Sequence, residues 1–126
     1  MLFRSASLLP IAVVTGCPRR LAESVLDRHG LAAHVRVVIA AEDGPGKPDP
    51  APVRAALQRL GVDAAWMLGD NPSDVQAARA AGVVPLAIQP RDAAHADALR
   101  AAGAARLLDS IAQLRELLSA LSIRRA

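Results

Sequence analysis

Residues 64–83, AAWMLGDNPSDVQAARAAGV, contain one complete strand-to-helix unit. An apolar run that ends at Leu68 predicts a buried strand. An alanine-rich stretch over 72–81 then predicts a helix, with Pro72 at its first position and Gly82 directly after its end. A strand that runs straight into a helix is typical of the βα units that build parallel sheets.

Two acids stand four residues apart at this corner, Asp70 and Asp74. They can be read as the oxygen ligands of a metal ion. They can equally be read as turn and cap residues, because Asn71 before a proline is a typical N-cap and an acid at the third helical position is favoured by the helix dipole. The corner by itself does not decide between these readings.

The same alternation of short β-branched runs and longer helical periods extends along the chain, and it predicts repeated βα units around a parallel sheet. No linker or repeat interrupts it, so we expect a single domain over residues 1–126. The expected strands cover residues 11–15, 35–40, 65–68, 83–88 and 105–108, and the expected helices cover about 18–29, 50–60, 72–81, 92–102 and 110–121.

Composition narrows the class of protein. Apolar residues make up 52% of the 126 residues but aromatic residues only 2%, so the core must consist of Ala, Val, Leu and Ile. The net charge of +3 comes from basic residues scattered among acids, which argues against nucleic-acid binding. No apolar stretch approaches the roughly 20 residues that span a bilayer, so we expect no membrane partner. A single cysteine, Cys17, excludes an intramolecular disulfide and fits a cytoplasmic protein.

Small or charged residues follow three of the expected strands: Thr15 and Gly16, Lys47 in the Pro/Gly-rich loop 41–50, and Asp70. The carboxyl ends of parallel strands meet at one edge of a sheet, where ligands bind. Thr15 and the amides after it could bind phosphate oxygens, Lys47 could neutralise phosphate charge, and Asp70 could hold Mg²⁺. Each residue alone has a purely structural reading, and their joint occurrence in this order favours a site.

Three segments resemble the second, third and fourth motifs of the haloacid dehalogenase-like (HAD) hydrolases: AVVTG at 12–16, GKPDP at 46–50 and MLGDNPSDVQAARAAG at 67–82. The run KPDPAPVRAAL at 47–57 is similar to the phosphoglycolate-phosphatase-like branch. The resemblance covers about residues 11–121. It implies an α/β fold, a three-layer α/β/α Rossmann-like core with a mostly parallel sheet, and a Mg²⁺-dependent phosphatase that acts on a small phosphorylated metabolite.

The resemblance also implies a role for each residue. Thr15 and Gly16 would bind the phosphoryl group, Lys47 would balance charge on the nucleophile and the phosphate, and Asp70 would ligate Mg²⁺. Asp74 would support the metal, directly or through water. In such enzymes an Asp attacks phosphorus to form an aspartyl-phosphate, a second Asp two residues later acts as general acid and base, and water releases phosphate.

The chain departs from this pattern at the first motif, D-x-D-x-T, which precedes the Thr-Gly motif in the family. Residues 1–14 contain no Asp and no Glu. We therefore expect an incomplete core that lacks the nucleophile, the first strand and the cap, that binds Mg²⁺ weakly or not at all, and that is catalytically incompetent alone. The first strand would lie between strands 11–15 and 65–68. Without it those two strands must pair directly, recruit residues 2–9, take a strand from another chain, or expose apolar edges.

Three hypotheses remain open at this point. The chain could be an inactive remnant of a HAD phosphatase, a non-catalytic module that binds a phosphate ligand or a partner, or one half of a split phosphatase whose partner chain supplies the missing strand. A homodimer is a further form of the last hypothesis.

Two other site classes are excluded by spacing. A P-loop needs a glycine where Ala41 stands and Ser or Thr where Pro48 stands, so EDGPGKP is no nucleotide-binding loop. His29, His34 and His95 show no metal-ligand spacing, and we expect them at the surface.

Overall fold

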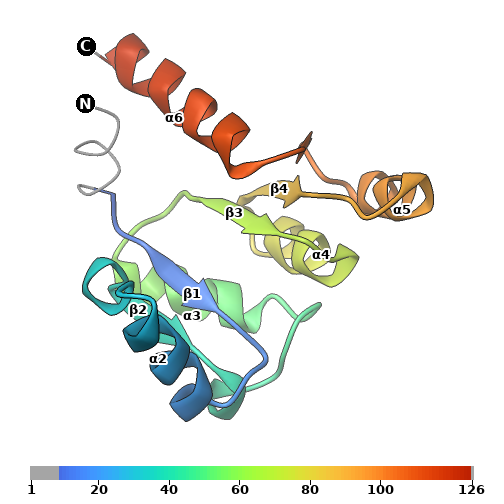
Figure 1. The fold of residues 1–126 in the computed structure, drawn as a ribbon. Coiled ribbons are helices and arrows are strands. Elements are labelled where there is room, and N and C mark those ends of the chain that lie inside the picture. The colour runs from blue at the N-terminus through green and yellow to red at the C-terminus, as the bar shows by residue number, and fades with distance from the viewer. Residues whose placement is uncertain (1–8, 126) are drawn as a thin grey trace.

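A computed structural model describes residues 9–125 of the chain, and it confirms the predicted alternation of strands and helices (Figure 1). The strands are β1 (Ala12–Val14), β2 (Val37–Ile39), β3 (Trp66–Gly69), β4 (Val84–Ile88) and β5 (Arg106–Leu108). The helices are α2 (Arg19–Arg28), α3 (Ala51–Leu60), α4 (Pro72–Ala80), α5 (Ala93–Ala102) and α6 (Ile111–Arg125), with short 3₁₀ turns η1 (Ala32–His34) and η2 (Ala41–Asp43).

The strands form two parallel sheets instead of one. β1 pairs with β2, with Val14 opposite Ile39, and β3, β4 and β5 pair in that order, with Leu68 opposite Leu86. Within the described residues β1 and β3 have no pairing with each other. The expected direct pairing of these two strands is therefore not adopted. The alternative that residues 2–9 fill the gap falls mostly on residues 1–8, which lie outside the described part of the chain.

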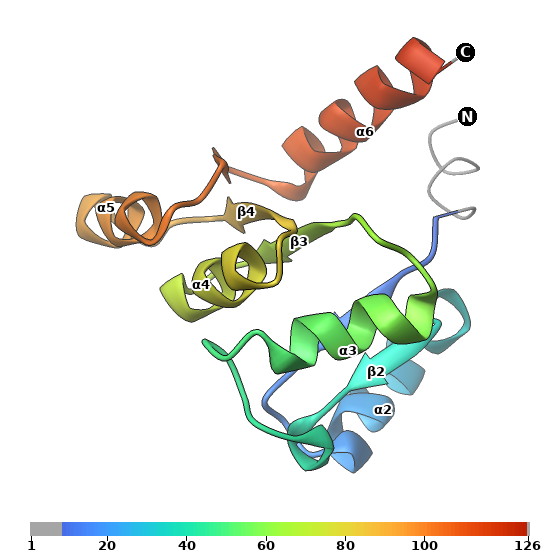
Figure 2. The ribbon, with the colours of Figure 1, turned by 180° about the vertical axis from the view of Figure 1, so that it is seen from behind.

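Helices cover the first sheet on both sides. α3 packs on β1 and β2, while α2 lies against β2 from the opposite face, as the front and back views show (Figures 1 and 2). α4 packs on β3 and β4 and contacts both α3 and α5, and α6 contacts β5. The contact between α3 and α4 is one link between the two halves of the core.

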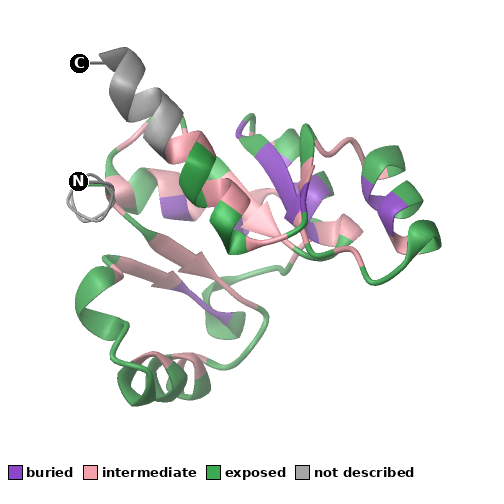
Figure 3. Ribbon diagram, turned by 45° about the horizontal axis from the view of Figure 1, so that its top comes forward, coloured by how far each residue is buried: buried purple, intermediate pink, exposed green. Residues whose placement is uncertain are grey.

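Small apolar residues build the core, as the composition predicts. One cluster joins α3 and α4 through Val53, Ala77 and Ala78. A second cluster joins α4, β4 and α5 through Val75, Ala87 and Leu99. Buried residues are found in α3, α4, β4 and α5, whereas α2 contains none (Figure 3). The first sheet is therefore well covered by α3 on one face and poorly covered by α2 on the other.

The C-terminal helix α6 is longer than the predicted 110–121 and reaches Arg125. Its first residue, Ile111, is 56% exposed, whereas Gln113 and Leu114 in the same turn are half-buried. None of the described helices is long and apolar enough to cross a membrane.

Candidate functional site

The end of β1 forms the first part of the site. Thr15 remains aligned with the sheet because its amide donates to the carbonyl of Ile39 at 2.9 Å. Its hydroxyl oxygen accepts the amide of Cys17 at 3.1 Å, which tightens the turn at Gly16. A cavity of about 210 Å³ opens here, lined by this turn and by the loop after β2, including Thr15, Gly16 and Lys47. Its volume is several times the roughly 30 Å³ that one water takes in the liquid.

Lys47 reaches from the loop after β2 to two other elements. Its Nζ donates to the carbonyl oxygen of Val14, the last residue of β1, at 3.2 Å. The same nitrogen lies 2.6 Å from Oδ1 of Asp74 in α4. One ammonium group therefore links the carboxyl end of β1 to the corner that follows β3, as the sequence order predicts.

Asp74 is the most constrained residue of that corner. Its Oδ2 accepts the amides of Asp70 and Asn71, both at 3.1 Å, and only 7% of the residue is exposed. Gly69 makes this approach possible, because a Cβ on that residue would lie 2.6 Å from Cγ of Asp74. Asp74 thus caps α4 and fixes the turn.

Asp70 differs from Asp74. It is exposed, and no described group, which for side chains means residues 9–118, bonds to its carboxylate. Two carboxylates near one corner are hard oxygen donors of the kind that Mg²⁺ takes. Within the described part of the chain, however, no three His, Cys, Asp or Glu side chains gather closely enough to hold a metal ion. These residues fit Mg²⁺ only as an incomplete ligand set, so we derive no step of the reaction through a metal.

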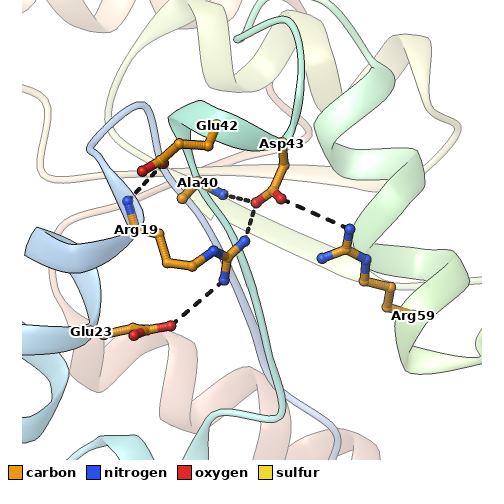
Figure 4. Close-up of polar contacts among 6 residues, drawn as sticks. All are labelled: Arg19, Glu23, Ala40, Glu42, Asp43 and Arg59. Atoms are coloured by element: carbon orange, nitrogen blue, oxygen red, sulfur yellow. Dashed lines mark hydrogen bonds and ion pairs between the residues drawn. The ribbon is translucent and has the colours of Figure 1, made fainter.

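A charged cluster that the sequence did not reveal binds the start of α2 to η2 (Figure 4). The Arg19 guanidinium pairs with the carboxylate of Asp43. The backbone amide of Arg19 donates to Oε1 of Glu42 at 2.8 Å. These partners are more than 20 residues apart in sequence, so no local pattern reveals the contact. Glu42 accepts the backbone amide of Arg19, so this amide at the start of α2 is not free to bind an anion. Of the amides after Thr15 that were expected to bind phosphate, those of the turn at Gly16 remain as candidates.

Asp43 holds this cluster together electrostatically. The Ala40 amide donates to its Oδ2 at 2.7 Å, and this hydrogen bond is the largest cause that lowers the pKa of the Asp43 carboxyl. Arg19 and Arg59 lower the pKa further by charge, while burial acts in the opposite direction. The carboxylate is thus stabilised in its ionised form, and it fixes the loop that leads to Lys47.

His95 does not lie free on the surface as expected. It is half-buried, with Nε2 2.8 Å from the carbonyl oxygen of Asp70 and Nδ1 2.9 Å from an Arg91 guanidinium nitrogen. A carbonyl only accepts and a guanidinium only donates, so these partners favour the tautomer with the proton on Nε2. His95 therefore supports the backbone of Asp70. His29 and His34 are exposed, as predicted.

Sequence comparison identifies relatives for most of the chain. The haloacid dehalogenase-like hydrolase family matches residues 2–82. The plasmid-encoded phosphoglycolate phosphatase of Cupriavidus necator is 40% identical over 112 residues, which are 86% of this chain and 48% of that protein. The phosphoglycolate phosphatase of Rhodospirillum rubrum is 45% identical over 76 residues, which are 58% of this chain and 32% of that protein.

Structural comparison gives the same result for the fold. The crystal structure of a HAD family hydrolase from Deinococcus radiodurans, with bound phosphate and sodium, matches 94% of this chain and 56% of that one, with a TM-score of 0.79 and 26% sequence identity. The match extends over nearly the whole chain, so it includes both sheets. The chain spans about half the length of its first relatives, or less.

Proposed function

This chain belongs to the haloacid dehalogenase-like hydrolases, in their phosphoglycolate-phosphatase-like branch, and from that premise we propose that it provides the phosphate-binding side of a phosphate-monoester hydrolase. The observation that carries the proposal is the double contact of Lys47, with the Val14 carbonyl and with the Asp74 carboxylate. It draws the ends of β1 and β3 to one place, beside the cavity that Thr15 and Gly16 line.

In this proposal the cavity takes the phosphoryl group. The Thr15 hydroxyl still has a proton to donate, since its oxygen serves as acceptor for Cys17, and the Gly16 turn offers a backbone amide. The Lys47 ammonium, partly shielded from water, would balance the negative charge that phosphate brings. These groups bind and orient the ester.

The nucleophile has to come from outside the chain. No two aspartates stand two positions apart anywhere in the 126 residues, so the D-x-D pair of the family is not among them. A missing covalent nucleophile typically costs several powers of ten in rate. We therefore propose that the isolated chain binds phosphate esters without turning them over, and that it is active only when another polypeptide segment supplies the two carboxylates.

The same segment would complete a Mg²⁺ site. Asp70, whose carboxylate is exposed, would be a ligand, and Asp74 would support it from the turn. Bound Mg²⁺ would supply charge neutralisation at the transferring phosphoryl group. With only the carboxylates of this chain, binding of the ion is expected to be weak.

Phosphoglycolate is the first substrate to test, because the relatives from Cupriavidus necator and Rhodospirillum rubrum are named phosphoglycolate phosphatases. We further place the chain in the cytoplasm, which suits the exposed free thiol of Cys17.

Phosphorus-31 NMR tests binding and turnover in one sample. With phosphoglycolate and Mg²⁺, the wild-type chain should broaden the ester signal while no inorganic phosphate accumulates. Thr15→Val should reduce the broadening, and Ser24→Ala, an exposed serine of α2, should leave it unchanged. Accumulation of phosphate by the wild type but not by Asp70→Asn would refute the proposed inactivity. Broadening that Thr15→Val does not change would refute the binding site.

A second candidate is a binding module without catalysis. It is favoured by the fact that the residues around the 210 Å³ cavity include Thr15, Gly16 and Lys47 but neither Asp70 nor Asp74. Inorganic phosphate should then bind to the wild type and to Asp70→Asn with the same affinity in the absence of Mg²⁺. Equilibrium titration by calorimetry measures this, and a large loss of affinity in Asp70→Asn would exclude it.

A further inference from the structure

The walls of the cavity beside Thr15 come from separate parts of the chain. One wall is the turn 14–16 after β1, and most of the other is made by residues of the loop 40–47 after β2. A phosphoryl group in this cavity would touch Thr15 and Gly16 on one side and Lys47 on the other. The separation of the two segments therefore decides whether these groups reach the same ligand.

Side-chain packing does not fix either wall. The turn contains Gly16 and the loop contains Gly44 and Gly46, and no described atom lies within 4 Å of a Cβ placed on any of these three residues. Residues 16–18 and 41–46 are all exposed. Glycine allows more backbone conformations than other residues, so exposed segments of this kind vary in position unless polar contacts hold them.

The polar contacts between the two segments gather at the start of α2, directly after the turn. The Ala41 amide donates to the carbonyl of Cys17 at 2.9 Å. The Arg19 guanidinium pairs with the carboxylate of Asp43. Oδ2 of the same carboxylate accepts the amide of Ala40, a buried residue, at 2.7 Å. One carboxylate thus connects the helix that follows the turn with the first residue after β2.

We infer that Arg19 and Asp43 are positioning residues for the proposed phosphate site. The described residues that line the cavity include neither of them, so they act through the two segments that they join. Their ion pair holds the turn 14–16 and the loop 40–47 at the separation at which one phosphoryl group can touch both. This role rests on the proposed function, because a phosphoryl group is the ligand that the two segments would share.

A second arginine approaches the same carboxylate and provides a matched control. Nη2 of Arg59 lies 3.9 Å from Oδ1 of Asp43, and it comes from α3, on the side opposite to Arg19 (Figure 4). The side chain of Arg59 is 52% exposed, against 33% for that of Arg19. Ion pairs of exposed side chains contribute little to stability. Removing Arg59 therefore removes the same charge near Asp43 but no link between the turn and the loop.

Positioning and simple charge effects predict opposite results for Asp43→Asn. Asp43 stands in the loop between Ala41 and Gly44, which line the cavity. Loss of its negative charge would by Coulomb attraction alone make phosphate bind more tightly. The same change weakens the hold on Arg19, because a neutral amide replaces a charged hydrogen-bond partner. If the pair positions the two walls, phosphate binds more weakly instead.

Titration of inorganic phosphate by calorimetry, without Mg²⁺, measures these effects. Arg19→Met and Asp43→Asn should each raise the Kd for phosphate at least about fivefold, and Arg59→Met should change it less than about twofold. The double variant of Arg19→Met and Asp43→Asn should bind about as weakly as the weaker single variant, because the partners of one pair act as a unit. Arg19→Lys keeps the charge and one hydrogen bond to the carboxylate, so it should restore part of the affinity.

Hydrogen exchange reports on the joined segments without a ligand. The Ala41 amide bridges the loop and the turn through Cys17, so it should exchange at least about tenfold faster in Arg19→Met than in the wild type. The amide of Leu86, in the buried middle of β4, should exchange equally in both and is the control for a general loss of stability. If Arg19→Met does not fold, Asp43→Asn compared with Arg59→Met gives the same test.

The outcomes separate the pair from the site. Absence of phosphate binding by the wild type would refute the proposed function, and the pair would then have no site to position. Binding by the wild type that Arg19→Met and Asp43→Asn leave within about twofold would refute the positioning role alone. Tighter binding by Asp43→Asn would also refute that role, as would equal losses of affinity in Arg19→Met and Arg59→Met, because charge would then account for the result.

Discussion

Lys47 and Asp74 form an ion pair of 2.6 Å in which the lysine also donates to the last carbonyl of β1 and the aspartate also accepts two amides at the start of α4. Neither side chain is more than about a fifth exposed. The pair therefore acts as the connection between the two sheets at the edge where the site lies.

Replacing Lys47 by methionine should destabilise the fold, because Asp74 would remain nearly buried without its cation. Fully buried pairs lose about 3–5 kcal/mol in this way, and for this partly exposed pair we expect about 2 kcal/mol. Urea unfolding followed by circular dichroism measures the loss. Arg20→Met, an exposed cation of α2, is the control and should change little. Equal losses in the two variants would show that the pair does not stabilise the corner.

Gly69→Ala should be costly although the change is a single methyl group. The added Cβ would overlap the side chain of Asp74, which cannot move without giving up two amides and Lys47. Overpacking of this kind costs about 1–3 kcal/mol. Gly46→Ala is the matched control, since nothing lies within 4 Å of a Cβ there. Thermal unfolding of both variants should separate them, and similar midpoints would contradict the close approach described above.

Asp43 should make the free energy of unfolding depend on pH in the acidic range. Its pKa is lower in the folded chain than the value of about 4 expected when it is unfolded. Its contribution is therefore fully present above that unfolded pKa and is lost as the pH falls through the folded pKa. The difference in urea midpoint between the wild type and Asp43→Asn should shrink between about pH 5 and pH 2. Asp63→Asn, another exposed carboxyl, serves as the reference for general acid effects. A difference in urea midpoint that stays constant with pH would show that the ionised Asp43 carboxylate does not stabilise the fold.

Asp70 should contribute to Mg²⁺ binding and little to the free energy of unfolding. Its carboxylate is exposed and has no protein partner within the described chain, so Asp70→Asn should leave urea unfolding unchanged within about 0.5 kcal/mol. Weak Mg²⁺ binding by calorimetry should be lost in this variant and retained in Asp63→Asn. If both variants bind the ion as the wild type does, Asp70 is not its ligand.

Much of this fold was predictable because its signals are local. The apolar run before Gly69 and the helix that begins at Pro72 are each written within a few residues, and the structure has them within one residue of the expected bounds. The order of Thr15, Lys47 and Asp70 was also enough to predict a common edge, since parallel strands end on the same side.

The contacts that were missed are those made between distant segments. Arg19 and Asp43 meet only because α2 follows β1 and η2 follows β2, and these paired parallel strands end side by side. Nothing in the local sequence around either residue indicates this contact. His95 has no metal-ligand spacing, but its helix packs beside α4 and brings the ring to the carbonyl of Asp70. The interruption of the sheet was foreseeable only as one of several outcomes, because sequence spacing does not say whether two edges pair or remain apart.

We propose that Thr15, Gly16 and Lys47 bind phosphate and that this chain does not itself supply the nucleophile. The most direct measurement is the steady-state rate of p-nitrophenyl phosphate hydrolysis by the 126-residue chain with Mg²⁺, compared with that of Asp70→Asn under the same conditions. We expect both rates to equal the background rate without protein. A Mg²⁺-dependent rate in the wild type that disappears in Asp70→Asn would contradict it.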